Sequence, residues 1–335
     1  MKIVPDQPKI AIIGTGALAS LFGARLSQAA DVTLIGSWKA QIKALQQDGL
    51  SIHELTGKQH HYPLLARQYP HDLYDFTPAD FAIVLVKSYQ TGLAAQRIKS
   101  CLKPGGVVLS LQNGLGNLET LEAALPEFKV SYGITMQGAN ITRPGTVVHA
   151  GNGPSIIDVQ PFLTPLFTLF KTVDFPMLTY EQYGATSISE VIWRKLIVNA
   201  AINPLTALLG KPNGFLATDP IGRQLCINTA IEAGRIAMLE GGWPTEKEGM
   251  IETLGIEVAT ATAPNRSSML QDVSRGGRTE IDSICGEVVA RAAKLGTAAP
   301  INATWLKLIK QVEKVDGGTQ GKPQFTAQEL RKLIS

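Results

Sequence analysis

The chain has 335 residues, of which 44% are hydrophobic and 18% charged, as is typical of a globular protein with a sizeable core. The formal net charge of +3 is small and no run of basic residues concentrates it, which argues against nucleic-acid binding. No apolar stretch is long enough to cross a bilayer and the N-terminal residues lack the apolar region of a signal peptide, so we expect no membrane partner.

The first half of the chain alternates short apolar runs with segments of helical period. In chain order the predicted elements are a strand at 10–13, a helix after a glycine turn, a strand at 31–37, a helix at 38–49, a strand at 81–87, a helix from about residue 91 and a strand within 103–114. The run at 81–87 is continuously apolar, as expected of a strand buried on both faces. This alternation predicts an α/β, Rossmann-type doubly wound domain with a mainly parallel sheet, which we place at residues 1–178.

The second half of the chain, from about Thr179, has longer periodic segments and few β-type runs. Helices are predicted at 187–210, 223–242, 247–263, 280–296 and 326–334, with a flexible linker at 316–324. We therefore predict a mainly α-helical domain at residues 179–335.

Cysteine and histidine do not occur in patterns that predict a metal site. Cys101, Cys226 and Cys285 are widely spaced and odd in number, which also argues against a disulfide framework. We therefore expect a reducing, cytoplasmic environment and no bound metal. His60 and His61 are expected to be exposed residues of a loop or an edge strand rather than ligands.

A glycine turn follows the first predicted strand and opens the first predicted helix. Its residues match the dinucleotide fingerprint G-x-G-x-x-G/A and are Gly14, Thr15, Gly16, Ala17, Leu18 and Ala19. The first glycine makes the tight turn, the second lets the backbone approach a pyrophosphate, and a small third residue lets the helix pack on its strand. In this context the pattern favours cofactor binding over a plain structural turn.

The end of the second predicted strand indicates which nucleotide is bound. Sites for NAD usually carry an acidic residue there, whereas sites for NADP often place an arginine nearby. This chain has no carboxylate there; Ser37 could donate a hydrogen bond to a 2′-phosphate and Lys39 could supply a positive charge. We therefore expect NADPH, with NADH left open because the arginine is missing and Lys39 could be an ordinary solvated residue.

A polar face lies on the otherwise apolar segment 193–205. Lys195, Asn199 and Asn203 recur every fourth residue and so stack on one side of a helix. A lone lysine could extend its ammonium to water, but asparagines need partners when buried, so three polar groups in register indicate the wall of a cleft. Pro204 should kink or break the helix there, and the turn holding Asn213 could close over the same cleft.

A lysine beside a nicotinamide suits the reduction of a carbonyl group. Hydride reaches the carbonyl carbon while negative charge builds on the oxygen, which a positioned ammonium can stabilise and then protonate. The asparagines can fix the other oxygens of the substrate. The predicted chemistry is therefore the reduction of a carbonyl group at a site expected between the two domains.

Nearly the whole length of the chain resembles the ketopantoate reductase (2-dehydropantoate 2-reductase) family. The resemblance rests on the stretches "IIGTGALASLFGARL", "IVLVKSYQT", "LQNGLGN", "WRKLIVNAAINPLTAL", "KPNG" and "NRSSMLQDVSRGGRTEID". It implies reduction of 2-dehydropantoate to (R)-pantoate with NADPH, in the pathway to pantothenate and coenzyme A. Two residues depart from the family pattern: Ala19 stands where glycine is usual, and Ser37 stands where many members have arginine.

The resemblance also implies roles for individual residues. It makes Lys195 the catalytic general acid and assigns substrate binding to Asn199, Asn203, Asn213, Ser268 and Asn113. It assigns cofactor binding to Lys87, Asn113, Glu280 and the backbone at Ala139, together with the glycine turn.

Simpler interpretations of four of these residues remain open. Lys87 could be a solvated residue at a strand end, and Asn113 could serve only to form a turn with the next glycine. Ser268 could be a helix N-cap, and Glu280 could belong to a capping box. If Glu280 lies close to Lys195, its carboxylate would favour the charged ammonium that a reductase needs.

Three further questions remain open at this stage. The chain could instead reduce another branched 2-keto acid, or it could bind NADP(H) as a regulatory protein without turnover. Apolar faces of the last helices could bury within the domain or between the subunits of a homodimer. The sequence predicts a small keto acid as the partner and does not decide among these alternatives.

Overall fold

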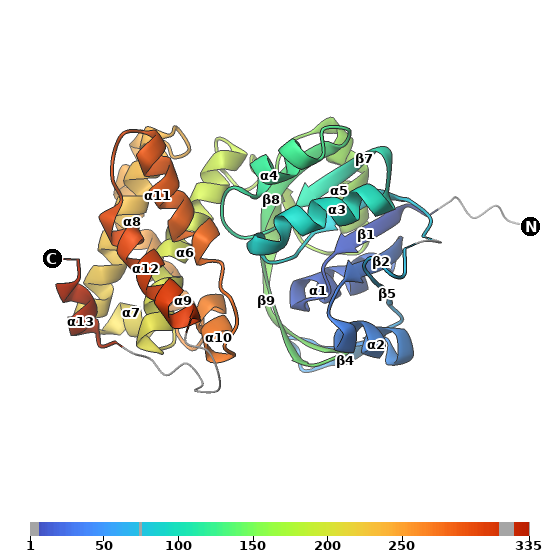
Figure 1. Ribbon diagram of the computed structural model, residues 1–335, viewed down its shortest axis with the longest axis horizontal. Coiled ribbons are helices and arrows are strands. Elements are labelled where there is room, and N and C mark those ends of the chain that lie inside the picture. Colours follow the sequence, from blue (N-terminus) through green and yellow to red (C-terminus); the bar gives the residue numbers. More distant parts are fainter. Residues whose placement is uncertain (1–6, 74–75, 315–324, 335) are drawn as a thin grey trace, which may run out of the picture. The chain divides into compact units, whose positions relative to one another are not determined.

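The computed structural model describes residues 7–73, 76–314 and 325–334, so the linker predicted at 316–324 lies outside the described residues. The chain divides into two compact units, whose elements are labelled in Figure 1. The first unit comprises Met1–Gln112 and Asn117–Ile188, and the second Asn113–Gly116 and Ser189–Ser335. The boundary predicted at 178/179 falls inside a short strand, Met177–Thr179, that pairs with another strand of the first unit.

Six parallel strands form the centre of the first unit. They are β1 (Lys9–Ile13), β2 (Asp31–Gly36), β5 (Leu65–Gln68), β6 (Ala79–Val84), β7 (Leu102–Ser110) and β8 (Lys129–Arg143). Their spatial order is β5-β2-β1-β6-β7-β8, and every neighbouring pair is parallel. Taken in chain order, this is the 3-2-1-4-5-6 arrangement of a dinucleotide-binding sheet. The predicted Rossmann-type fold is therefore confirmed.

The sheet continues beyond β8 with strands of mixed direction. They are β9 (Thr146–Ile157), β3 (Leu50–His53), β4 (Gln59–Tyr62) and β10 (Met177–Thr179). Strand β8 pairs antiparallel with β9, which in turn lies parallel to β3 and β10, while β3 and β4 are antiparallel. Strand β4 lies at the end of the strand order and exposes His60 and His61, as predicted.

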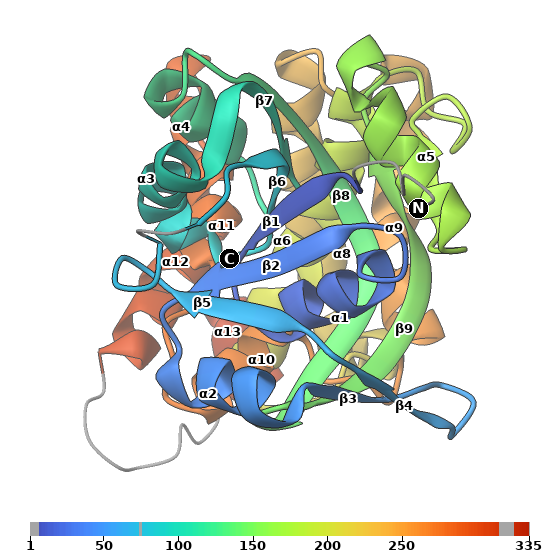
Figure 2. The same ribbon diagram turned by 90° about the vertical axis from the view of Figure 1, so that its right-hand side faces the viewer.

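Helices cover both faces of the parallel sheet. They are α1 (Ala17–Leu26), α2 (Lys39–Asp48), α3 (Thr91–Cys101), α4 (Asn117–Ala124) and α5 (Thr164–Thr172), with short 3₁₀ turns at Ser88–Gln90 and Pro161–Leu163. Along β1, Ile10 and Ile12 pack with α1, α2 and α5, whereas Ala11 and Ile13 pack with α3 and α4. Figure 2 shows α3 and α4 on one side of these strands and α1 on the other. A strand buried on both faces explains the continuous apolar runs in the sequence.

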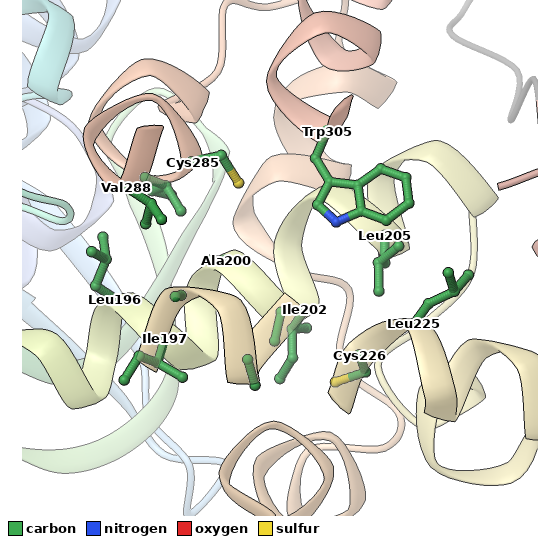
Figure 3. Close-up of a cluster of buried hydrophobic side chains, with 14 of the residues drawn as sticks. Leu196, Ile197, Ala200, Ile202, Leu205, Leu225, Cys226, Cys285, Val288 and Trp305 are labelled. Carbon is green, nitrogen blue, oxygen red and sulfur yellow. The ribbon is translucent and has the colours of Figure 1, made fainter. Parts of the chain in front are cut away.

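The second unit is helical. Its elements are α6 (Ile188–Leu209), α7 (Phe215–Thr218), α8 (Pro220–Leu239), α9 (Ile251–Ala261), α10 (Ser268–Ser274), α11 (Cys285–Lys294), α12 (Pro300–Glu313) and α13 (Ala327–Lys332), with 3₁₀ turns at Thr245–Met250 and Ile281–Ser283 (η4). Leu196, Ala200 and Leu205 of α6 lie in a core with Val288 of α11 and Trp305 of α12 (Figure 3). The predicted mainly α-helical second half is confirmed.

Helix α6 differs from expectation at its proline. It runs without interruption from Ile188 to Leu209, so Pro204 does not end it. The hydroxyl of Thr206 lies 2.9 Å from the carbonyl oxygen of Ile202 and 2.7 Å from the hydroxyl of Ser267 on the segment before α10. Burial of α6 among other helices holds this turn in place, because tertiary packing outweighs the local cost of the proline.

Two further observations concern the described residues as a set. None of their helices combines the length and the apolar character that a membrane span requires. Cys101, Cys226 and Cys285 are all buried free thiols.

Candidate functional site

The glycine turn of the first unit is shaped by its neighbours. Gly14 has a φ of 135°, and its N–H donates a 2.8 Å hydrogen bond to the carbonyl oxygen of Ile35 at the end of β2. A Cβ atom at this position would lie 3.2 Å from the carbonyl oxygen of Leu85, just beyond β6. Glycine is therefore required at residue 14 by both conformation and space.

Gly16 is a glycine for a different reason. A Cβ atom built there meets no atom of the described residues within 4 Å, so packing inside the protein does not demand its small size. It is the N-cap residue of α1, whose first N–H groups have no acceptor within the helix. Open space beside these donors fits the pyrophosphate of a dinucleotide.

The other residues of the turn complete this arrangement. The side chain of Thr15 lies over Gly36, where a Cβ atom would approach it to 2.5 Å, so the turn and the end of β2 are side by side. Ala17 and Leu18 open α1 and are partly buried. Ala19 is fully buried, as expected of a small residue that lets α1 approach the sheet.

The residues after β2 face solvent. Ser37 and Lys39 are exposed, and Lys39 is the first residue of α2. A lysine at a helix N-terminus is disfavoured by the helix dipole, and its N-cap residue is Trp38, whose indole can donate but not accept a hydrogen bond. This end of α2 therefore has cationic character that a 2′-phosphate would offset.

Two other predicted cofactor residues lie on the first unit. Lys87 follows β6 and is the partly buried N-cap residue of the 3₁₀ turn Ser88–Gln90, so it stands at the carboxyl end of a central strand as predicted. Ala139 lies within β8, opposite His149 of β9, and is partly buried.

The predicted polar face is present on α6. Lys195 and Asn199 are partly buried, and Asn203 is buried. Burial lowers the pKa of Lys195 to about 8, and the negative charge of Glu280 opposes this shift. Glu280, at the start of η4, is itself buried. The structure thus brings an ammonium and a carboxylate into electrostatic contact within the second unit.

Asn113 joins this pair. Its side-chain Nδ2 donates a 3.2 Å hydrogen bond to Oε2 of Glu280, which lies 167 positions along the chain. Asn113 belongs to the four-residue segment Asn113–Gly116, which the fold assigns to the second unit. It is therefore more than a turn former.

Asn213 has an incomplete set of hydrogen bonds. It is buried; its backbone N–H donates to the carbonyl oxygen of Asn265 at 2.9 Å, and its Nδ2 donates to the hydroxyl of Thr262 at 2.8 Å. Its Oδ1 atom is buried without a hydrogen-bond partner among the described residues. A buried acceptor of this kind costs free energy, which a hydrogen bond from a bound ligand would recover.

The helix start near Ser268 differs from its simpler interpretation. The N-cap residue of α10 is Ser267, whose hydroxyl accepts a 3.1 Å hydrogen bond from the N–H of Leu270. Ser268 is the first helical residue and is exposed, which leaves its hydroxyl accessible to a ligand.

The capping-box alternative for Glu280 does not describe the structure. Arg278 and Asp282 do form an exposed ion pair of 3.3 Å, but Thr279 donates its hydroxyl to Glu313 at 2.6 Å. Nothing in the sequence predicted the contact between Leu115 and Ser283, in which the N–H of Leu115 donates a 2.9 Å hydrogen bond to the carbonyl oxygen of Ser283. Only the glycines at 114 and 116 signalled a close approach there, without indicating its partner.

The constellation Lys195–Glu280–Asn113 can hold and deliver a proton. The glycine turn, Ser37, Lys39, Lys87 and Ala139 are placed on the first unit, where they fit a dinucleotide. In the described part of the chain, no group of three or more His, Cys, Asp or Glu side chains is placed to hold a metal ion.

Comparison with known proteins covers both units. Residues 10–161 match the family described as "Ketopantoate reductase PanE/ApbA", and residues 187–313 match "Ketopantoate reductase PanE/ApbA C terminal". A 2-dehydropantoate 2-reductase of Halobacterium salinarum is 33% identical over 308 residues, covering 91% of this chain and 99% of that protein. One of Archaeoglobus fulgidus is 34% identical over 310 residues, covering 91% and 98%.

Solved structures with a similar fold include a ketopantoate reductase and a D-mandelate dehydrogenase. A ketopantoate reductase from Ralstonia eutropha superposes with a TM-score of 0.80 at 29% identity, covering 91% of this chain and 98% of that one. A D-mandelate dehydrogenase in a ternary structure with NADH and anilino(oxo)acetate superposes with a TM-score of 0.82 at 25% identity, with the same coverage.

Proposed function

Since this chain belongs to the ketopantoate reductase family, we propose that it reduces 2-dehydropantoate to (R)-pantoate with NADPH. The reaction would contribute to the pathway that leads to pantothenate and coenzyme A. The observation that carries the proposal is the electrostatic pair of partly buried Lys195 and buried Glu280, with Asn113 bonded to the carboxylate.

Lys195 would serve as the general acid. A bound nicotinamide cofactor would supply the hydride for C2 of the substrate, and the oxygen attached to C2 would then gain negative charge. An ammonium directed at that oxygen stabilises the charge and can donate its proton. Burial makes the proton easier to release, while Glu280 keeps the ammonium charged near neutral pH.

The polar residues of the second unit would bind the substrate. Asn199 and Asn203 share the face of α6 that carries Lys195, and the exposed hydroxyl of Ser268 could bind a carboxylate. The unpartnered Oδ1 atom of Asn213 could accept a hydrogen bond from the substrate hydroxyl. A site built for that hydroxyl should discriminate strongly against substrates that lack it.

The first unit would bind the cofactor through the glycine turn, Lys87 and the backbone at Ala139. Ser37 and Lys39 support NADPH, because the exposed cationic start of α2 suits a 2′-phosphate. NADH is the alternative, since the arginine expected at Ser37 is missing.

A spectrophotometric assay tests the proposal. The purified chain is given 2-dehydropantoate or 3-methyl-2-oxobutanoate, which lacks the hydroxymethyl group, with NADPH or NADH in turn. We expect the highest kcat/KM with 2-dehydropantoate and NADPH, and a loss of about 10⁴-fold with the analogue if its missing hydroxyl leaves a buried acceptor unpaired. Equal rates with both keto acids would contradict the proposed substrate.

A second candidate activity is the reduction of another 2-keto acid. The similarity to a D-mandelate dehydrogenase solved with NADH and anilino(oxo)acetate supports this alternative. A panel of branched and aromatic 2-keto acids in the same assay separates the two. A purely regulatory NADP(H)-binding protein would bind cofactor without oxidising it in the presence of any of them.

A further inference from the structure

The four-residue segment Asn113–Gly116 belongs to a different unit from the residues on either side of it. Gln112 and Asn117 on either side of it belong to the first unit, whereas the four residues themselves belong to the second. The N–H of Leu115 donates a 2.9 Å hydrogen bond to the carbonyl oxygen of Ser283, and the Leu115 side chain packs against the hydrophobic core of the second unit. The segment is therefore anchored by both a hydrogen bond and an apolar contact.

Two glycines let this segment lie against its neighbours. Gly114 has a φ of +83°, and a Cβ atom there would lie 2.3 Å from the carbonyl oxygen of Ser283 and 2.6 Å from its Oγ. Gly116 has a φ of +80°, and a Cβ atom there would lie 2.8 Å from Oε1 of Glu287 on α11. Gly114 is the more constrained of the two, because its neighbour is backbone, which cannot rotate away.

Ser283 contacts Glu280 and the segment that carries Asn113. It is buried, its carbonyl oxygen receives the N–H of Leu115, and its hydroxyl donates a 3.0 Å hydrogen bond to the carbonyl oxygen of Glu280. The side chains of Glu280 and Asn113 then meet at 3.2 Å. One residue thus fixes the backbone on both sides of the Asn113–Glu280 contact.

We propose that Gly114 and Ser283 are positioning residues that hold Asn113 and Glu280 in register beside Lys195. This inference rests on the proposed function, in which Lys195 is the acid. Neither residue touches the reacting atoms. They act by setting where the carboxylate and the amide lie.

The variant Gly114→Ala tests the proposal against a matched control. The new methyl group must displace Asn113 from η4, and a misplacement of about 1 Å can cost about 100-fold in rate. Gly296→Ala is the control, because Gly296 has a φ of +70° and a Cβ atom there meets nothing within 4 Å of the described residues. It carries the same kind of backbone strain in the same unit without the collision.

We expect Gly114→Ala to lower kcat by at least about tenfold, and Gly296→Ala to leave kcat near the wild-type value although it adds the same kind of backbone strain. The alkaline limb of the rate profile should move to lower pH in Gly114→Ala, because a displaced Glu280 no longer supports the Lys195 ammonium. Ser283→Ala, which adds no bulk, should shift the profile in the same direction by less.

Two readouts do not depend on turnover. Hydrogen exchange at the Leu115 amide should be slow in the wild type and fast in Gly114→Ala, and the NMR titration of Lys195 should move to lower pH. If the wild type reduces no keto acid, the proposed function fails while these readouts still test the positioning role. An unchanged titration and rate profile in both Gly114→Ala and Ser283→Ala would overturn the proposal, as would an equal change in Gly296→Ala.

Discussion

Lys195 combines partial burial with a charge that the proposed reaction requires. Its pKa of about 8 means that the ammonium form is lost as the pH rises through that value. Because the protonated form would be the acid, reduction should be fastest below pH 8 and should decline above it. Stopped-flow measurement of the hydride-transfer step across pH 6 to 10 checks this expectation.

Replacing Lys195 gives the complementary prediction. Lys195→Ala should lower kcat by about 10²–10⁴-fold, as is usual when a general acid is removed, and the decline near pH 8 should disappear with it. Lys211→Ala is the matched control, because Lys211 is an exposed lysine in the same unit. A Lys195→Ala enzyme with the wild-type rate would refute the acid role.

Trp38 offers a direct view of cofactor binding. Of the four tryptophans, all within the described residues, Trp38 is 43% exposed and the other three are at most 2% exposed. It lies between Ser37 and Lys39, which we propose bind the cofactor. Iodide should therefore quench mainly Trp38, and NADPH should protect it from quenching. Trp38→Phe should abolish most of the quenching, and unchanged iodide access at saturating NADPH would place the cofactor elsewhere.

The placement of individual site residues could be predicted only in part from the sequence. The spacing of Lys195, Asn199 and Asn203 alone predicted a shared helix face, because helical geometry is local. The contact of Asn113 with Glu280 could not be predicted, because no local sequence pattern indicates a contact between residues 167 positions apart. Glu280 was identified as a candidate only through the family resemblance. The contacts of Ser283 became evident only in the structure.

At the scale of elements, α10 separates a structural role from a binding role in adjacent residues. Ser267 caps the helix and is buried, whereas Ser268 is exposed. Ser267→Ala should therefore destabilise the protein by about 1 kcal/mol, and Ser268→Ala should leave stability unchanged while raising the KM for the keto acid. Urea denaturation and steady-state kinetics on both variants check this, and a reversed pattern would contradict it.

The strands show where sequence patterns succeed and where they fail. The strand at β1 was predictable because its apolar run ends in a glycine turn. The long pair β8–β9 was missed, since the glycines and polar residues within 133–153 interrupt both apolar alternation and β propensity. The register shifts along this pair accommodate those residues, and they depend on tertiary packing rather than on local sequence.

At the scale of the whole molecule, the reactivity of the three buried cysteine thiols can be used to follow the unfolding of each unit separately. Burial raises the pKa of Cys101 and of Cys226 to about 12 and also raises the pKa of Cys285, so none should react with iodoacetamide at pH 8 in the folded protein. Cys226 and Cys285 share the core of the second unit, whereas Cys101 lies in the first.

We therefore expect Cys226 and Cys285 to become labelled together as urea increases, and Cys101 to follow the unfolding of its own unit. Pulse labelling followed by mass spectrometry measures the three sites individually. Rapid labelling of any one of them without denaturant would contradict the buried positions.

The membership of residues 113–116 in the second unit also affects any attempt to express the two units as separate polypeptides. A polypeptide expressed from Ser189 onward would lack the leucine that completes its own core, and an N-terminal product ending at Ile188 would carry that leucine away from its partners. A fragment of the second unit would therefore expose the apolar surface that Leu115 covers, and restoring that contact requires grafting the four-residue segment onto it.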